Sequence, residues 1–338
     1  MTNFSELLRG FFTDAIRGVD VVAAVEREIR CDGTNFYLGD LCCDVGDVRR
    51  LLVIAVGKAA SAMYEGAMRG IERCLDAGVN VEAIVVGPVS PEPRENMIFC
   101  PGSHPIPDEM SRRAAEIVTL RLQSVDQQTA VVFLVSGGAS SMMEQPLDPA
   151  ISVEDTAEFY RCLVGSGLPI REMNVVRKHF SAVKGGRLAE RASRAAAICT
   201  LIVSDVPDGS LSSVGSGPSV PDDLTRAHCL SILSRLVERA SLPETVMHFF
   251  AGPLFVDTPR PNNAAFQRSY AKAILSSDDL AAAVVRLASD ASSHVEIDNT
   301  CDEWDYRDAG LYLLERSRDL ESRYPSFCLI SVGRTPGK

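Results

Sequence analysis

The chain has 338 residues, more than one hydrophobic core usually holds, so two domains are predicted. Its 45 acidic and 34 basic side chains give a net charge of -11 without a compensating basic run, which argues against a nucleic-acid partner. Hydrophobic residues make up 46% of the chain, but no apolar run reaches the length of a membrane-spanning helix, so a soluble globular protein with no membrane partner is expected.

The start of the chain and its cysteines favour a cytoplasmic location. Residues 4–30 follow an amphipathic helical pattern with an early acid, Glu6, and lack the cationic start and apolar block of a secretory leader. The ten cysteines include no CxxC pair, and the adjacent Cys42 and Cys43 would make a poor disulfide framework. The five histidines show no zinc-ligand spacing, so no structural metal is expected.

Apolar runs and helical patterns alternate through the middle of the chain. Continuous apolar runs predict buried strands at residues 51–56, 82–86, 130–135 and 197–203. Helical patterns separate them, at residues 59–74, 108–124 and, as several helices, 153–194. Strands joined by helices in this way form parallel pairs, so the predicted fold class is α/β with a parallel sheet.

A domain boundary is predicted near Ser241-Leu242-Pro243, after a helical pattern over residues 222–240. Beyond it the alternation restarts, with elements predicted at residues 269–275, 278–291, 295–298, 306–322 and 327–331. The first, third and last of these are strands, and the other two are helices. The prediction is therefore an N-terminal domain over residues 1–240 and a partial second α/β domain over residues 241–338.

Three predicted strands end in turns that carry candidate site residues. Gly57 and Lys58 follow the first strand, and Asp205 follows the strand at 197–203. Residues 136–141 form a Ser-Gly-Gly-Ala-Ser-Ser turn after the strand at 130–135. Because ligands of open α/β sheets bind beyond the carboxyl ends of the strands, these turns are expected to surround one crevice.

The glycine turn suits an anion. Gly137 and Gly138 would let backbone N–H groups approach a phosphate closely, and the start of the following helix would add positive potential. Ser136, Ser140 and Ser141 would supply hydroxyl donors. The alternative is a tight turn whose serines only cap a helix.

Lys58 and Asp205 are the kinds of side chain that phosphoryl transfer requires. A lysine directly after a buried strand points into the crevice, where its ammonium can neutralise the charge of a transferred phosphate. The alternative for Lys58 is a solvated surface lysine. Asp205 can hold Mg²⁺ or accept a hydroxyl proton, or else it forms an Asx turn before Pro207.

The densest basic patch places Asn174, Arg177 and Lys178 within one helical turn, followed by Lys184. In an acidic chain this patch can bind a carboxylate or phosphates, although a solvated helix face is the ordinary alternative. His104, in a Pro-rich turn, can contact substrate, but a histidine in such a turn is more often structural.

Two nucleotide-binding motifs are missing from the sequence. No GxGxxG follows a predicted strand, so nicotinamide binding is poorly supported. Residues 333–338 imitate a Walker A loop, but they are one residue short between the glycines and lack the Ser or Thr that should follow. A dinucleotide-dependent oxidoreductase is therefore the weaker prediction.

Taken in order, these segments resemble the glycerate 2-kinase family, a class of glycerate kinases some of whose members are named hydroxypyruvate reductases. The resemblance covers roughly residues 4–240, with matching blocks at residues 56–60, 104–108, 134–141, 172–181, 184–189, 204–207 and 216–222. It implies two α/β domains, the first of them Rossmann-like, with the active site in the cleft between them. It also implies phosphorylation of D-glycerate at its 2-hydroxyl by ATP with Mg²⁺.

The resemblance also assigns residues. Lys58 looks like the family's essential active-site lysine, and residues 136–141 resemble its ligand-binding loop. Gly57 and His104 lie in matching blocks and are assigned to substrate or ATP binding. The further cleft residues that it implies are Asn174, Arg177, Lys184 and Asp205.

Two departures from the family pattern affect the expected activity. The usual Val-Pro-Gly-Asp reads Val-Pro-Asp-Gly at residues 206–209, which shifts a carboxylate by one position. The family's C-terminal domain, of the MOFRL type, carries a Gly-Gly-Glu turn and a later Gly-Gly-Arg-Asn-Gln-Glu motif. Residues 330–335 replace that turn and the second motif is absent, so the chain is expected to be truncated in this domain.

Three hypotheses follow from these observations. The first is a glycerate 2-kinase. The second is a truncated, catalytically impaired member that still binds ligands, and whose uncovered sheet edge would favour a homodimer. The third is a hydroxypyruvate reductase, which would oxidise NADH and would need the dinucleotide motif that is missing.

Overall fold

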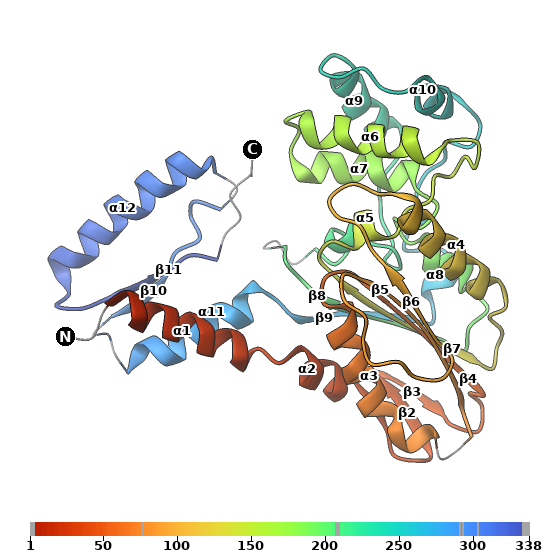
Figure 1. The fold of residues 1–338 in the computed structure, drawn as a ribbon, viewed down its shortest axis with the longest axis horizontal. Helices are drawn as coiled ribbons and strands as arrows, with labels where there is room; N and C mark the ends of the chain where they lie inside the picture. Colours follow the sequence, from red (N-terminus) through yellow and green to blue (C-terminus); the bar gives the residue numbers. More distant parts are fainter. Residues whose placement is uncertain are drawn as a thin grey trace. The chain divides into compact units, whose positions relative to one another are not determined.

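The structure, a computed structural model, describes residues 4–75, 78–206, 210–290, 292, 294–302 and 304–332. The chain divides into two compact units (Figure 1). The larger comprises Val21–Val203 and Ser210–Ile274, and the smaller comprises Met1–Asp20, Ser204–Gly209 and Leu275–Lys338. The units therefore do not divide near residue 240, where the sequence predicts a boundary.

A six-stranded sheet forms the centre of the larger unit, with strand order β6-β5-β4-β7-β8-β9. Its strands are β4 (Arg50–Val56), β5 (Asn80–Gly87), β6 (Met97–Pro101), β7 (Thr129–Ser136), β8 (Ala197–Val203) and β9 (Ser269–Leu275). Neighbouring strands from β6 through to β8 are parallel. The predicted α/β fold class is confirmed.

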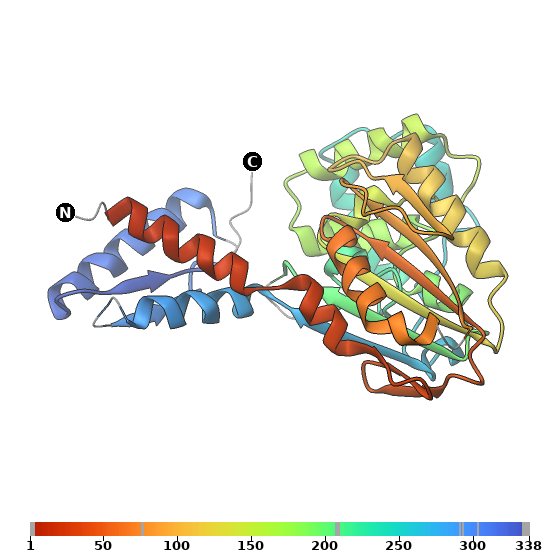
Figure 2. The same cartoon turned by 60° about the horizontal axis from the view of Figure 1, so that its bottom comes forward.

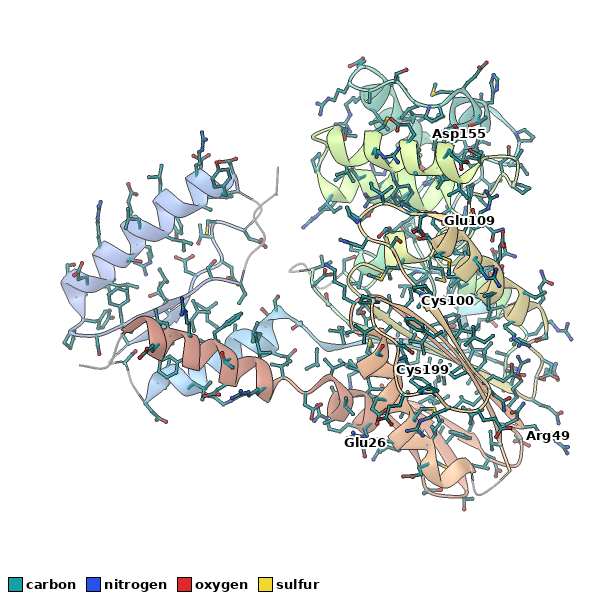
Figure 3. The ribbon with its side chains drawn as sticks, in the orientation of Figure 1. Glu26, Arg49, Cys100, Glu109, Asp155 and Cys199 are labelled. Atoms are coloured by element: carbon teal, nitrogen blue, oxygen red, sulfur yellow. The ribbon has the colours of Figure 1, made fainter. Side chains whose placement is uncertain are left out.

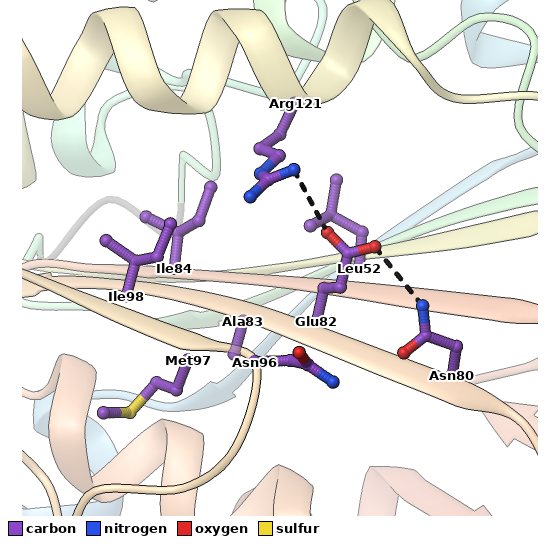
Figure 4. Close-up of a pocket in the computed structure, with 9 residues that line it drawn as sticks. All are labelled: Leu52, Asn80, Glu82, Ala83, Ile84, Asn96, Met97, Ile98 and Arg121. Atoms are coloured by element: carbon purple, nitrogen blue, oxygen red, sulfur yellow. Dashed lines mark hydrogen bonds and ion pairs between the residues drawn. The ribbon is translucent and has the colours of Figure 1, made fainter.

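Helices cover both faces of this sheet, which explains why its central strands β4, β7 and β8 are largely apolar. Successive side chains of a strand point to opposite faces. On one face, side chains such as Val53 pack in a core with α2 (Val21–Glu28) and α3 (Ala60–Leu75) (Figure 2). On the other face, Leu52 points towards α4 (Glu109–Gln123) (Figure 4). Strands that are buried on both sides lose the polar alternation of a half-exposed strand.

The first fifty residues fold differently from the prediction. The helical pattern over residues 4–30 is two helices, α1 (Phe4–Gly18) and α2, which belong to different units. The region after it is a three-stranded antiparallel sheet and not a simple connection, with strands β1 (Ile29–Cys31), β2 (Asn35–Leu38) and β3 (Leu41–Asp44). Strands this short carry too few alternating residues for a sequence pattern to identify them.

Four helices of the larger unit build a second core, rich in phenylalanine. They are α6 (Val153–Gly165), α7 (Ile170–Phe180), α9 (Arg226–Val237) and α10 (Glu244–Ala251). The ring centroid of Phe250, in α10, lies 6.1 Å from that of Phe159 in α6 and 6.4 Å from that of Phe180 in α7. This packing holds α10 in the larger unit, although it follows the predicted boundary. The shorter elements are α5 (Ala139–Met142), α8 (Arg187–Arg191), η1 (Val214–Ser216) and η2 (Ala264–Phe266).

The smaller unit combines α1 with the last elements of the chain. These are α11 (Ser277–Ser289), β10 (Val295–Ile297), α12 (Tyr306–Arg323) and β11 (Cys328–Ile330). β10 and β11 form a parallel pair, and α1 packs against α11. The elements predicted beyond residue 277 are confirmed within a few residues. β9 is also confirmed as a strand, but it extends the sheet of the larger unit.

Most cysteines of the described residues are free thiols, and several lie in the cores. Cys100 and Cys199 are buried in the sheet (Figure 3). Cys31 is disulfide-bonded, which the sequence analysis does not anticipate. Within the described residues no helix is both long and apolar enough to cross a membrane, and no three His, Cys, Asp or Glu side chains gather as a metal site.

Candidate active site

Hydrogen bonds join the turn after β4 to the turn after β7. The two strands are parallel neighbours, so both turns leave the same edge of the sheet. The backbone N–H of Lys58 donates to the carbonyl of Gly137 at 2.9 Å. The N–H of Ala59 donates to the buried Oγ of Ser136 at 3.0 Å. Two of the three turns therefore converge as the sequence predicts.

Two glycines keep the space between these turns free of side chains. Gly57 has a φ of +120°, and a Cβ there would lie 2.4 Å from Ser136 Oγ. Gly138 has a φ of +87°, and a Cβ there would lie 3.3 Å from Lys58 Cγ and 3.4 Å from His104 Cδ2. The hydrocarbon stem of Lys58 and the ring of His104 thus flank the glycine turn. Both side chains are solvent-exposed, so an anion can reach this place.

The three serines of the glycine turn have different surroundings. Ser136 is buried and holds the turn after β4. Ser141 is buried as well, and its hydroxyl donates to the carbonyl of Gly138 at 3.4 Å. Both hydroxyls therefore stabilise the turns, but neither caps α5, whose N-cap residue is Gly138 and which has no side-chain cap hydrogen bond. Ser140 is partly exposed, and its Oγ lies 3.0 Å from Ser216 Oγ.

A chain of hydrogen bonds runs from Ser140 to α7. The hydroxyl of Ser216 donates to Asn174 Oδ1 at 3.1 Å, and Arg177 Nη1 donates to the same oxygen at 3.4 Å. Arg177 is 8% exposed, and its Cζ lies 5.1 Å from the ring centroid of Tyr160. The fold thus brings together three of the predicted binding residues, Ser140, Asn174 and Arg177.

The structure corrects the surroundings expected for Lys184, which is predicted to bind substrate or ATP. Its side chain is 1% exposed, and its Nζ lies 2.7 Å from Glu144 Oε2 and 3.1 Å from the carbonyl of Met143. Burial lowers the pKa of Lys184, and the Glu144 carboxylate opposes that shift. The ammonium therefore has an internal partner and does not face solvent.

The rest of the basic patch is also internal, not a solvated helix face. Lys178 is 4% exposed and forms an ion pair with the buried Asp222. Lys178 and Lys184 thus each have a carboxylate partner. Arg177 has none within 4.0 Å among the described residues, and its buried Nε has no hydrogen-bond partner there. A buried guanidinium without a carboxylate is unusual and indicates a place for an anion.

Comparison with known proteins identifies the family. Residues 7–251 match the family described as "Domain of unknown function (DUF4147)". The chain belongs to this family. A D-glycerate 2-kinase of Thermotoga maritima is similar to it, with 36% identity over 206 residues, 59% of this chain and 48% of that protein. A protein of Agrobacterium vitis, provisionally named a hydroxypyruvate reductase, is 40% identical over 192 residues, 55% of this chain and 41% of its own length.

Solved structures agree with this membership. The crystal structure of a glycerate kinase from Thermotoga maritima matches with a TM-score of 0.73 at 26% identity, covering 99% of this chain and 76% of that one. The predicted relation to the glycerate 2-kinase family is confirmed. The chain spans less than half the length of each of the two curated relatives named above.

One predicted site residue of this DUF4147 protein lies in the smaller unit. Asp205 is exposed and stands two residues after the end of β8. Residues 207–209, with their departure from the family pattern, are outside the described residues, as are residues 333–338. The catalytic and metal-binding roles of Asp205 stay predictions.

Sequence reasoning about the family blocks does not single out Glu144, Tyr160 or Ser216. Glu144 is an acid after two buried methionines, and a buried acid requires a partner, which is the one signal available for it. Ser216 lies in a matching block without an assigned role. Its positive φ of +60°, unusual for a serine, is a further sign of a special position.

The pocket of Figure 4 is separate from these residues. It has a volume of about 270 Å³ and is lined by Asn80, Glu82 and Arg121 among others. It lies where β5 and β6 begin, whereas the residues described above follow the ends of β4 and β7. Its charged side chains pair with each other, Arg121 Nη1 lying 3.8 Å from Glu82 Oε2.

Proposed function

We propose that this protein is a glycerate 2-kinase, which transfers the terminal phosphoryl group of ATP to the 2-hydroxyl of D-glycerate. The observation that carries the proposal is the position of Lys58, whose stem lies against Gly138 at the carboxyl edge of the sheet. Relatives that are named D-glycerate 2-kinase and glycerate kinase support the choice of reaction.

Lys58 is assigned the charge-stabilising role. Phosphoryl transfer requires little covalent help from a protein, so positioning and stabilisation of charge supply most of the catalysis. An ammonium next to a glycine turn can stabilise the negative charge on the oxygens of the phosphoryl group during its transfer. In α5 the N–H groups of Ser141 and Met142 donate to the carbonyl of Gly138, which leaves those of Ala139 and Ser140 for phosphate oxygens.

The residues present fit ATP and Mg²⁺. Gly138 leaves space for a phosphate next to the turn, because a Cβ there would fill it. The N–H groups of Gly57, Lys58 and Ala59 already donate to other groups of the fold. Mg²⁺ in kinases is held by one or two carboxylates together with substrate phosphates, so a cage of several protein ligands is not required. Asp205 is the carboxylate we assign to it. When bound, the ion would neutralise phosphate charge.

Turnover of the full chain tests the proposal directly. Incubation with Mg-ATP and D-glycerate should yield 2-phosphoglycerate, which chromatography separates from the 3-phosphate. Lys58→Ala should lower kcat by about a hundredfold or more, because a charge next to the transferred group is lost. Lys272→Ala is the matched control, since that exposed lysine of β9 forms an ion pair with Glu28 and its loss should leave kcat unchanged.

Two results would contradict the proposal. One is the absence of any phosphoglycerate at high enzyme concentration. The other is a Lys58→Ala variant that is folded, by its thermal denaturation, and as active as wild type. Thermal stabilisation by D-glycerate or ATP without turnover would select a member that binds ligands but is catalytically impaired.

The name of the Agrobacterium vitis relative makes hydroxypyruvate reduction the second candidate. It predicts oxidation of NADH on addition of hydroxypyruvate, which absorbance at the nicotinamide band would detect. The glycine turn after β7 lacks the GxGxxG spacing of a dinucleotide site, so we expect no such oxidation.

The proposal extends to location and assembly. Free thiols, which most described cysteines are, persist in a reducing compartment such as the cytoplasm. The disulfide bond of Cys31 is the feature that argues against this location. A homodimer is proposed from the sequence alone, and sedimentation of the purified chain would test it.

A further inference from the structure

One buried cluster of the larger unit holds more cations than carboxylates. Arg177, Lys184, Glu144 and Tyr160 are each at most 8% exposed, so the cluster holds two cations and one carboxylate away from water. Glu144 Oε2 is engaged twice, because Lys184 Nζ lies 2.7 Å from it and the hydroxyl of Tyr160 donates to it. The cluster therefore keeps one positive charge without a counter-ion, and that charge is on Arg177.

The donors around Arg177 converge on the exposed side of the cluster. Its Nη1 shares Asn174 Oδ1 with the hydroxyl of Ser216, which in turn meets Ser140. Asn174 uses its oxygen in these contacts, so its amide N–H groups remain for a ligand. Asn174 and Ser140 are partly exposed. An open set of donors beside an uncompensated guanidinium matches a planar carboxylate, which arginine binds with two parallel hydrogen bonds.

Hydrogen bonds from the same cluster also hold the backbone of the glycine turn in place. The hydroxyl of Tyr160 lies 3.4 Å from the carbonyl of Ser140, and Lys184 Nζ donates to the carbonyl of Met143 at 3.1 Å. The first contact connects the turn to α6, which carries Tyr160, and the second connects the segment after the turn to the stretch that follows α7, the helix of Arg177 (Figure 1). Ser140 and Arg177 are thereby held in fixed relation to each other.

We propose that Arg177 receives the carboxylate of the substrate, and that Lys184 is a positioning residue that keeps Glu144 from neutralising Arg177. The identity of the substrate, D-glycerate, rests on the proposed function. The two ends of the glycine turn then divide the recognition. The Gly138 end, with Lys58, takes the phosphoryl group, and the Ser140 end, with Arg177, takes the carboxylate next to the hydroxyl that is phosphorylated.

The first test is binding without ATP, measured by isothermal titration calorimetry of the full chain. Wild type should bind D-glycerate and bind glycerol, which lacks the carboxylate, far more weakly. Arg177→Met should weaken D-glycerate binding at least about tenfold, since a charge-assisted hydrogen bond is lost. Arg177→Lys keeps the buried charge and should retain part of the affinity if Arg177→Met fails to fold.

The second test uses the partner pair. Lys184→Met frees Glu144 to neutralise Arg177, so the KM for D-glycerate should rise at least about tenfold while the KM for ATP stays constant. Glu144→Gln combined with Lys184→Met removes both charges and should return the KM for D-glycerate close to the wild-type value. A purely structural role would lower thermal stability without this recovery.

These outcomes separate the inference from the kinase assignment. Wild type that binds D-glycerate through Arg177 without turnover supports the inference and contradicts the kinase proposal. The inference is overturned if wild type does not bind D-glycerate, if Arg177→Met binds it unchanged, or if that variant raises the KM for ATP alone. It is equally overturned if the folded double variant does not recover.

Discussion

Gly57 shows how one residue sets the geometry of the candidate site. Its φ of +120° is a backbone conformation that residues other than glycine rarely adopt. Ser136 occupies the space that a Cβ at this position would need. The chain can therefore turn directly after β4 and bring Lys58 against Gly138. The sequence marks this position through a glycine after a buried strand, so the turn after β4 can be predicted from the sequence.

Gly57→Ala should lower the free energy of unfolding by at least about 2 kcal/mol, because it combines a strained φ with a close approach to Ser136. Gly165→Ala is the matched control. Gly165 ends α6, has no atom within 4 Å of a Cβ and should change stability by at most about 1 kcal/mol. Urea unfolding compares the two, and equal stabilities would refute the argument.

At the scale of elements, α4 begins at a capping box. Asp108 Oδ1 accepts from the N–H of Ser111 at 3.0 Å, and Ser111 Oγ accepts from the N–H of Asp108 at 3.2 Å. Burial alone would raise the pKa of Asp108, but hydrogen bonds from Ser103 and Ser111 outweigh it and lower the pKa. The capping hydrogen bonds explain this part of the resemblance block at 104–108 without a ligand.

Asp108→Ala should destabilise the protein by about 1 kcal/mol, the usual cost of a lost N-cap. Asp108→Asn keeps a capping oxygen and should lower the free energy of unfolding by only a few tenths of the loss expected for Asp108→Ala. Because the folded pKa is lowered, the carboxylate contributes its stability above the unfolded value of 3.8, and this contribution is lost as the pH falls below it. Equal midpoints of thermal denaturation for the two variants would contradict the cap.

Across the whole molecule, buried thiols make stability depend on alkaline pH. Cys229, in the phenylalanine-rich core, is fully buried, and burial raises its pKa from 9.0 to about 12. Burial also raises the pKa of Cys199 in the sheet. In the unfolded chain these thiols ionise first. Their contribution to stability is therefore complete below about pH 9 and is lost as the pH rises towards 12.

When the pH rises from 8 to 10.5, ionisation of each such thiol in the unfolded chain should lower the free energy of unfolding by about 2 kcal/mol. Cys229→Ala should therefore lose less stability over this range than wild type does, whatever its stability at pH 8. Cys42→Ala, which removes an exposed thiol, should follow wild type. Urea unfolding followed by circular dichroism at both pH values decides this, and parallel losses in all three proteins would rule it out.

Much of the fold of the larger unit follows from the sequence, because its signals are local. An apolar run identifies a strand buried on both faces, and β4, β7 and β8 lie within one residue of their predicted positions. The short strands β1 to β3 have no such run, and the edge strand β6, Met97–Pro101, has only a short one. These segments become strands because they pair with neighbouring strands, and no local sequence pattern shows which segments will pair.

By itself, the sequence determined the α/β class, the glycine turn at residues 136–141 and the place of Lys58, since backbone conformation and hydrophobic burial are encoded within a few neighbouring residues. Only the tertiary structure decided that Lys184 is enclosed with Glu144 while Arg177 has no carboxylate. Charge pairing depends on which side chains the fold brings within a few ångströms, here across forty positions of the chain.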